Sequence, residues 1–388
     1  MEPEVQPQTQ EVLPAEAAPQ AAIAPDPITL APEPKKFPGL RWFFIGSGGL
    51  RAGWSVLIFL ILFVLFASGI GFTFVHFHLV NKNSGFTASS AFLGEMISFL
   101  AMVGAGALVA LIERRRNSVL AFNLTGPRSM NHFLGGFLAG FLALSALIGG
   151  LAWGGWLHFG PIALSGTEIF KYAAVWGAAF LCVGFVEEGL FRCYLQFTLT
   201  RGINFWWALG IIGCVCLDLV MRSKGNGVWG VYIVALAGLV PCLLLQLRKA
   251  EGSGFWQAAW VTSTLFGFVH TGNGGENWIG IFAAAAIGFV FVVSVRVTGS
   301  AWWAIGCHAA WDWAETYFYG AADSGNVATG HYLSTSPAGN VLWSGGTDGP
   351  EGSVLVLGII LLLLLLLMAI YGRKKPALVS VAAIDAVA

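Results

Sequence analysis

Long runs of apolar residues, separated by short polar or glycine-rich connections, follow one another along most of the chain. A helix needs about 20 mostly apolar residues to cross a bilayer. Ten segments are candidate spans by this rule, although several in the middle of the chain are short. They are Trp54–Val75, Ala91–Ile112, Phe133–Trp156, Ala173–Leu199, Phe205–Met221, Val228–Leu247, Phe255–His270, Ile279–Val297, Trp302–Tyr319 and Val354–Tyr371.

Two stretches break this apolar pattern. Residues 1–40 are rich in Pro, Ala, Gln and acidic residues, which predicts a disordered acidic tail. Residues 320–352 are rich in Gly, Ser, Thr and Asn, which predicts a long external loop before the last span. We therefore expect a cytoplasmic tail at residues 1–40, a transmembrane domain at residues 41–375 and a short C-terminal tail at residues 376–388.

Composition supports placing most of this apolar surface in lipid. Hydrophobic residues make up 56% of the chain and charged residues only 10%, whereas soluble domains carry roughly 25% charged residues. The predicted fold class is all-α, a polytopic bundle of about eight to ten transmembrane helices with the lipid bilayer as its partner. The formal net charge is +0, so no nucleic-acid partner is expected.

Basic residues indicate the orientation, because cytoplasmic loops carry an excess of Lys and Arg. If the N-terminus and the C-terminus are both cytoplasmic, most basic positions fall on the cytoplasmic side. The positions assigned to that side are Lys35, Lys36, Arg41, Arg51, Arg114–Arg116, Arg192, Arg201, Arg248, Lys249, Arg296 and Arg373–Lys375. The opposite side receives Lys82, Lys171, Arg222 and Lys224.

Ionisable residues inside the predicted spans are candidates for function, because a charge at mid-bilayer costs at least a few kcal/mol. Glu187, Glu188 and Arg192 share one apolar segment. At about 100° per residue, Arg192 lies about 40° from Glu188 but about 140° from Glu187. We therefore expect Glu188 and Arg192 to form an ion pair, with Glu187 available as a base. The alternative is a structural ion-pair cluster that joins two helices.

Two further segments carry histidines. His270 ends a short apolar segment, and the following Thr-Gly-Asn-Gly-Gly predicts a helix stop. This places His270 several ångströms nearer the outer surface than Glu187, unless its helix is tilted or starts late. His308 and Asp312 share a helix face with Glu315, which lies about 20° from His308. The alternative to a functional role for His308 and Asp312 is an interfacial aromatic belt that tolerates polar residues. However, carboxylates and imidazoles on three spans are the usual components of a hydrolytic site.

The order and spacing of these motifs resemble those of the CPBP family. This family comprises the type II CAAX-prenyl endopeptidases and bacterial relatives, including bacteriocin-processing and immunity proteins. The similarity covers roughly residues 133–319. The motifs that carry it are Glu187-Glu188-x-x-x-Arg192, Phe266-x-x-x-His270 and His308-x-x-x-Asp312.

The resemblance implies an intramembrane endopeptidase of a bacterial inner membrane, which hydrolyses a peptide or lipidated-protein substrate in a cavity within the bilayer. It implies that Glu187 and His270 activate the attacking water, and that His308 and Asp312 stabilise the oxyanion. The residues that would support the site are Glu188 and Arg192.

Two features depart from the family pattern. The last motif of the family often ends in Asn, whereas an ionised Asp312 cannot donate a hydrogen bond to an oxyanion. Asp312 is therefore either protonated or serves to orient His308. Two candidate spans also separate Glu188 from His270, and Asp218 lies in this insertion without an obvious partner.

A bound Zn²⁺ is a further question raised by the resemblance, because such relatives are often described as metalloproteases. Glu187, His270 and His308 could supply three ligands and leave an open position. However, the chain contains no His-Glu-x-x-His motif, and general-base hydrolysis needs no metal. We therefore favour a metal-free site.

Two other functions agree with the same residues. Buried acids and histidines also form proton relays, so a proton-coupled transporter is one alternative. A transporter of this kind is expected to contain paired broken helices in matching halves, and the sequence shows no such symmetry. The other alternative is a catalytically silent scaffold or immunity protein that retains the cavity.

Overall fold

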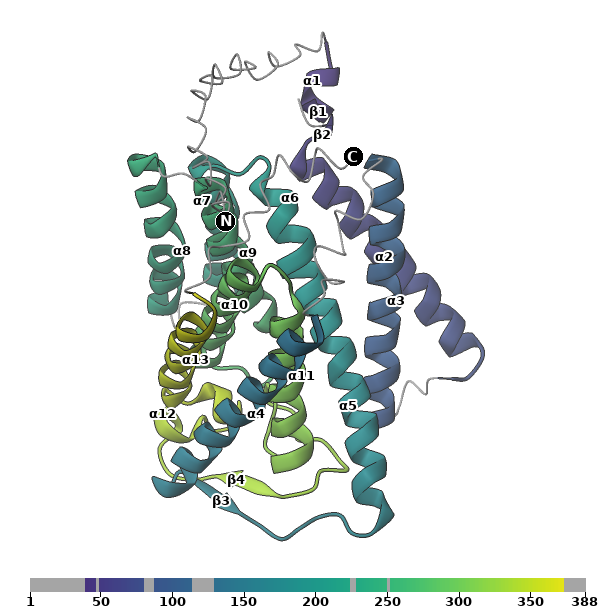
Figure 1. Ribbon diagram of the computed structural model, residues 1–388, viewed down its shortest axis with the longest axis vertical. Coiled ribbons are helices and arrows are strands. Elements are labelled where there is room, and N and C mark those ends of the chain that lie inside the picture. Colours follow the sequence, from purple (N-terminus) through teal and green to yellow (C-terminus); the bar gives the residue numbers. More distant parts are fainter. Residues whose placement is uncertain are drawn as a thin grey trace, which may run out of the picture.

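The computed structural model describes residues 39–46, 49–79, 87–113, 129–223, 228–249 and 252–372. Helices dominate these residues (Figure 1). Strands within the described part of the chain form only two short antiparallel pairs, which confirms the all-α fold class. Three sets of residues used in the predictions lie outside the described residues. They are almost all of the predicted tail at 1–40, the tail at 376–388 and several of the basic positions that indicate the orientation.

Each of the ten predicted spans corresponds to a helix or to a set of consecutive helical segments. Two of these sets contain π-helical turns, labelled η1 and η2. The elements up to α8 are α1 (Arg41–Phe44), β1 (Ile45–Gly46), β2 (Gly49–Leu50), α2 (Ala52–His76), α3 (Ala88–Glu113), α4 (Ser129–Trp153), β3 (Leu157–Phe159), α5 (Thr167–Glu188), η1 (Gly189–Leu195), α6 (Gln196–Thr200), α7 (Phe205–Ser223) and α8 (Val228–Arg248). The remaining elements are α9 (Ser253–His270), α10 (Trp278–Thr298), α11 (Trp302–Asp312), η2 (Trp313–Tyr319), β4 (Thr335–Pro337), α12 (Val341–Ser344), η3 (Pro350–Gly352) and α13 (Leu355–Tyr371).

Seven helical segments within the described residues are long and apolar enough to cross a membrane. They are α2, α3, α4, the continuous segment from α5 to α6, α7, α8 and α10. The chain is therefore an integral, multi-pass membrane protein. The helix α13 is apolar but shorter, and α9 and α11 are not among the seven. The helix α9 buries Gln257, Thr262 and Ser263 inside the bundle, so it does not need the composition of a lipid-facing span.

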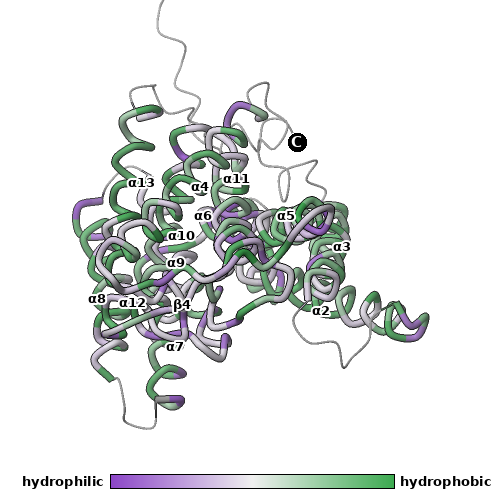
Figure 2. The backbone as a smooth tube through the Cα atoms, turned by 90° about the horizontal axis from the view of Figure 1, so that it is seen from below, coloured by the Kyte–Doolittle hydropathy of each residue, from purple (hydrophilic) through white to green (hydrophobic). Residues whose placement is uncertain are grey.

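The outer helices present apolar side chains to their surroundings. Seen from below, α2 and α3 lie at one side of the bundle and α8 and α13 at the other, with α9, α10 and α11 between them (Figure 2). Leu65 of α2, Leu236 of α8 and Leu365 of α13 are all exposed. Such residues are expected where lipid rather than water is the solvent.

Glycines bring α4 and α11 into backbone contact. A Cβ atom added to Gly140 would lie 2.1 Å from the carbonyl oxygen of Cys307. A Cβ atom added to Gly306 would lie 2.2 Å from the carbonyl oxygen of Phe133. Small residues permit this close approach in membrane helices. The contact fixes the position of α11, and therefore of His308, which directly follows Cys307.

The segment predicted as an external loop, residues 320–352, contains regular elements and is bound to the rest of the protein. Its strand β4 pairs with β3 in antiparallel register, with Thr335 opposite Phe159. The Asp348 carboxylate accepts a hydrogen bond from the backbone N–H of Asn277 at 3.0 Å, at the start of α10. The Asn277 side chain donates in turn to the carbonyl oxygen of Gly352 at 3.2 Å. These contacts hold the segment against the end of the bundle at which α10 begins.

Two π-helical turns interrupt the expected α-helical geometry. The turn η1 follows directly after Glu188 and contains Arg192, and η2 follows directly after Asp312. A wider helical turn changes the direction in which the following side chains project, so the angles expected from a regular α-helix hold only up to Glu188. Such π-helical turns occur frequently at functional sites.

Candidate active site

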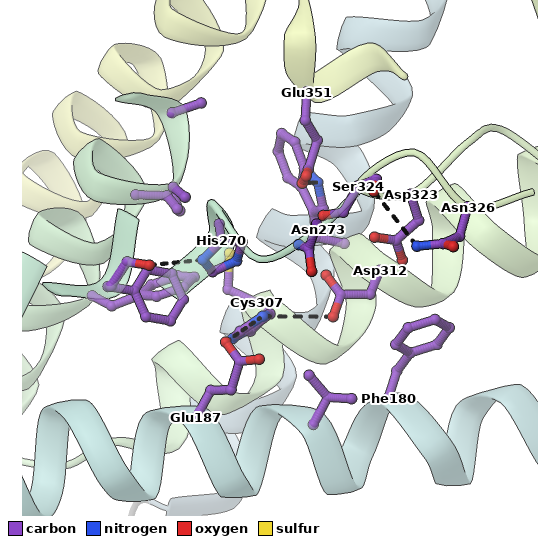
Figure 3. A pocket seen from close by; sticks show the side chains of 18 of the residues that line it. Phe180, Glu187, His270, Asn273, Cys307, Asp312, Asp323, Ser324, Asn326 and Glu351 are labelled. Atoms are coloured by element: carbon purple, nitrogen blue, oxygen red, sulfur yellow. Dashed lines mark hydrogen bonds and ion pairs between the residues drawn. The ribbon is translucent and has the colours of Figure 1, made fainter. Parts of the chain in front are cut away.

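Three helices bring the predicted residues to one cavity of about 260 Å³. Glu187 reaches it from α5, His270 from the end of α9, and His308 and Asp312 from α11. Figure 3 shows the labelled side chains of Glu187, His270 and Asp312 around the same space. Segments that are more than 100 residues apart in sequence therefore meet here.

Glu188 does not line this cavity and instead connects Arg192 with His308. One carboxylate oxygen lies 3.1 Å from Nε of Arg192, which confirms the predicted ion pair. The other accepts a hydrogen bond from Nδ1 of His308 at 2.9 Å. Glu188 and Arg192 are almost completely buried, with side-chain exposures of 0% and 1%. An ionised carboxylate only accepts hydrogen bonds, so Nδ1 of His308 carries a proton.

Aromatic rings surround the Arg192 guanidinium. Its central carbon lies 3.9 Å from the ring centroid of Phe266 and 5.3 Å from that of Phe291. Both terminal nitrogens are buried without a hydrogen-bond partner. The cation is therefore stabilised by Glu188 and by cation–π contacts, which are worth about 2 kcal/mol or more when desolvated.

Glu187 occupies a different environment from its neighbour in sequence. Its side chain is 32% exposed, and its nearest ionisable partner is Nε2 of His308 at 3.8 Å. This distance is within the range of an ion pair but too long for a hydrogen bond. The separation of Glu187 from the Glu188–Arg192 pair agrees with the helical angles expected from sequence, because η1 begins only after Glu188.

His270 is oriented by its own helix. Its Nδ1 lies 2.7 Å from the carbonyl oxygen of Phe266, one helical turn earlier. A carbonyl oxygen can only accept, so Nδ1 carries the proton and Nε2 of the neutral ring is a hydrogen-bond acceptor. The expected difference in height between His270 and Glu187 does not separate them, because both line the cavity. The helix α9 starts late, at Ser253.

Asp312 and Asp218 were the two open questions among the acidic residues. The Asp312 carboxylate lies 3.5 Å from Nε2 of His308 on the same helix, so it can orient the imidazole. Asp218 does have a partner, because it forms an i,i+4 ion pair with Arg222 near the end of α7. Glu315 does not line the cavity beside His308, because it lies in η2 rather than in a continuing α-helix.

Sequence analysis missed several polar residues that line the cavity. Glu95 of α3 is one of them, and an isolated acid in a predicted span was the only signal that pointed to it. Asn273 follows α9, and Asp323 and Glu351 belong to the segment predicted as a loop. Nothing in the local sequence of that segment indicates that it returns to cover the cavity.

The geometry does not suit the zinc site considered above. A tetrahedral zinc site requires its ligand atoms about 2.0–2.2 Å from one ion, and hence close to one another. Across the described residues, one group of three or more candidate ligands has its ligand atoms within 4.8 Å of one another, and that group is Glu315, Asp323 and Glu351. Among the described residues, Glu187, His270 and His308 do not form such a group.

The segment that contains these motifs matches a known protein family. Residues 169–314 match the family model described as type II CAAX prenyl endopeptidase Rce1-like. The matched segment contains all three motifs and ends before Asp323 and Glu351. No curated protein and no solved structure matches the chain. The match confirms the resemblance to CAAX-protease-like proteins over residues 169–314.

Proposed function

We propose that this protein is an intramembrane endopeptidase in which Glu187 and His270 activate a water molecule. The observation that carries the proposal is the division between two adjacent carboxylates. Glu188 is engaged by Arg192 and His308, whereas Glu187 faces the cavity without a hydrogen-bonded partner for its buried oxygen. A general base requires a carboxylate of the second kind.

Water activation follows from the orientation of the two groups. Nε2 of His270 and the carboxylate of Glu187 are both hydrogen-bond acceptors that line the cavity. A water between them donates one proton to each acceptor, which directs its lone pair towards a substrate carbonyl. As the oxygen attacks, Glu187 takes a proton, and it later returns this proton to the leaving amine. General acid–base catalysis of this kind contributes about 10²–10⁴-fold in rate.

His308 is suited to stabilise the oxyanion. Its Nδ1–H donates to the buried Glu188 carboxylate, and its Nε2 faces the carboxylates of Glu187 and Asp312. In an imidazolium with a proton on each nitrogen, Nδ1–H donates to Glu188, while Nε2–H faces Glu187 at 3.8 Å and Asp312 at 3.5 Å as an ion pair without a hydrogen bond to either. Its Nε2–H is then a charged donor directed towards the developing oxyanion. In this arrangement Asp312 orients the ring and does not itself donate.

The steps above require only side chains of this chain. They use no metal, because Glu187, His270 and His308 are not gathered around one point. The substrate is proposed to be a peptide or a lipidated protein that enters from the bilayer. We also propose, from the distribution of basic residues, that both termini face the cytoplasm of a bacterial inner membrane.

Peptide cleavage by the purified protein in detergent tests this proposal. The substrates are a farnesylated CAAX peptide, the same peptide without the lipid, and a mixture of unmodified peptides analysed by mass spectrometry. We expect Glu187→Gln to reduce cleavage by at least about 100-fold. The matched control is Glu168→Gln on the same helix, because Glu168 is exposed and pairs only with Lys171 at 3.3 Å.

Each outcome of this comparison has a distinct meaning. Equal cleavage by wild type and Glu187→Gln would refute the role assigned to Glu187. Loss of cleavage in Glu168→Gln as well would point to a general effect of losing an acid on this helix. No cleavage by folded wild-type protein with any substrate would favour the catalytically silent alternative, and ion flux in vesicles would then favour transport.

A further inference from the structure

Three carboxylates that take no part in the proposed reaction meet at the end of the bundle at which α10 begins. Glu315 belongs to η2, Asp323 follows η2, and Glu351 belongs to η3. One carboxylate oxygen of each lies within 4.8 Å of the others. In Figure 3, Asp323 and Glu351 lie on the side of the cavity away from Glu187.

Glu315 is the member whose surroundings call for a ligand. Its exposure is 0%, and within the described residues neither of its carboxylate oxygens has a hydrogen-bond partner. Asp348, also 0% exposed, has one carboxylate oxygen without a partner. In the part of the chain that the structure describes, no ion pair joins these four acids to a lysine or an arginine. A buried charge without a partner is strongly unfavourable.

The other two carboxylates are held so that one oxygen of each remains available. The hydroxyl of Thr316 donates to Oδ2 of Asp323 at 2.8 Å. The indole N–H of Trp311 donates to Oε1 of Glu351 at 2.6 Å. Among the described residues, no hydrogen bond reaches Oδ1 of Asp323, Oε2 of Glu351 or either carboxylate oxygen of Glu315. The hydroxyl of Thr316 and the indole of Trp311 therefore orient the carboxylates of Asp323 and Glu351 by binding one oxygen atom of each.

The spacing of this group makes it unfavourable without a counter-charge. Three ionised carboxylates whose oxygens lie within 4.8 Å of one another repel each other, and Glu315 is fully buried. Either protons or a cation must balance these charges.

We propose that Glu315, Asp323 and Glu351 bind one hard divalent cation, Ca²⁺ or Mg²⁺. Both ions take oxygen ligands, Ca²⁺ at about 2.3–2.6 Å and Mg²⁺ at about 2.0–2.1 Å. Two oxygen ligands of one Ca²⁺ ion are thus at most about 5 Å apart, and the three carboxylate oxygens, which all lie within 4.8 Å of one another, satisfy this limit. Asp323 and Glu351 line the cavity, so the ion has a route to the site.

The cation would connect the two ends of the segment that covers the cavity. Glu315 precedes residues 320–352, and Glu351 lies at the end of this segment, next to α13. One ion therefore closes the segment onto η2, which continues the helix that carries His308 and Asp312. This inference is independent of the proposed function, because its readouts are binding and stability rather than cleavage.

Thermal unfolding of purified full-length protein tests the site. Protein treated with a chelator is melted alone, with Ca²⁺ and with Mg²⁺, because a ligand that binds only the folded state raises the melting temperature. We expect one or both ions to raise it by several degrees in wild type and in Glu168→Gln, and not in Glu315→Gln. No shift in wild type with either ion would overturn the proposal and would indicate that protons alone balance the cluster.

Terbium luminescence gives a second measurement that does not depend on stability. Tb³⁺ takes Ca²⁺ sites, and its emission is excited by a nearby indole such as Trp311. In wild type we expect Tb³⁺ emission that is lost when Ca²⁺ displaces the Tb³⁺. The emission should be several-fold weaker in Trp311→Phe and absent in Asp323→Asn. Asp323→Asn retains the size of the side chain, so it replaces Glu315→Gln as the test variant if Glu315→Gln fails to fold. Undiminished emission in Asp323→Asn would place the Tb³⁺ elsewhere and refute this site.

Discussion

The contact between α4 and α11 gives a sharp test of how the candidate site is positioned. Replacement of Gly140 by alanine places a Cβ atom 2.1 Å from the carbonyl oxygen of Cys307. Carbon and oxygen atoms in close contact are normally about 3.3 Å apart, so the two helices must separate by about 1.2 Å. Gly136 and Gly306 make backbone contacts of the same kind between these two helices, so a simple sliding motion does not relieve the clash.

The expected effect has two parts. Overpacking of a well-packed interior costs about 1–3 kcal/mol in the free energy of unfolding. Because His308 directly follows Cys307, it moves with α11 relative to Glu187 and Glu188 on α5. A displacement of about 1 Å in a catalytic group can reduce the rate by about 100-fold. Gly140→Ala is therefore expected to lose both stability and peptide cleavage.

Gly149→Ala is the matched control, because Gly149 lies on the same helix and an added Cβ atom would meet nothing within 4 Å. Alanine is favoured over glycine in helices by about 1 kcal/mol, so the control should be as stable as wild type or more stable. Both variants are unfolded in detergent and followed by tryptophan fluorescence. Equal stability of Gly140→Ala and Gly149→Ala would show that the helices are not in backbone contact, and the argument for the position of His308 would fail.

Two further predictions concern buried charges. Arg192→Met leaves the fully buried Glu188 with His308 as its only charged partner among the described residues, and should lower the free energy of unfolding by about 3–5 kcal/mol. Adding Glu188→Gln should restore part of this loss. Purely additive losses of the two substitutions in a denaturant titration would contradict this prediction. Burial and Glu276 raise the pKa of Asp348 from 3.8 to about 7, so its contribution to stability is fully present below pH 3.8 and is lost as the pH rises to about 7. Melting temperatures measured in chelator across this range should therefore fall less steeply in Asp348→Asn, and an unchanged slope would show that Asp348 is not the group responsible.

The sequence alone predicted the features that depend on neighbouring residues. The ten apolar segments became helices because hydropathy and length act over about 20 consecutive residues. The Glu188–Arg192 ion pair formed as expected because residues four apart share a helix face. The separate environment of Glu187 followed from the same geometry. These predictions needed no knowledge of how the helices pack together.

The features that sequence could not predict depend on long-range packing. Asp323 and Glu351 reach the cavity because β4 pairs with β3 and Asp348 binds the start of α10. A segment rich in glycine and small polar residues carries no periodicity that would indicate these contacts. The two π-helical turns were also unpredicted, because nothing in the local sequence after Glu188 or Asp312 distinguishes a π-helical turn from a regular α-helix. The position of Glu315 changed as a result.

Phe266 explains why the three motifs act as one site. Its ring lies 3.9 Å below the Arg192 guanidinium, and its carbonyl oxygen accepts the hydrogen bond from His270. The same ring contacts the imidazoles of His270 and His308, with centroid distances of 4.8 and 6.1 Å. We therefore expect a change at Arg192 to act on His270 through the position of this ring, although the described contacts include no hydrogen bond between the two side chains. The aromatic residue of the second motif thus connects the buried ion pair to His270, the histidine proposed to activate water.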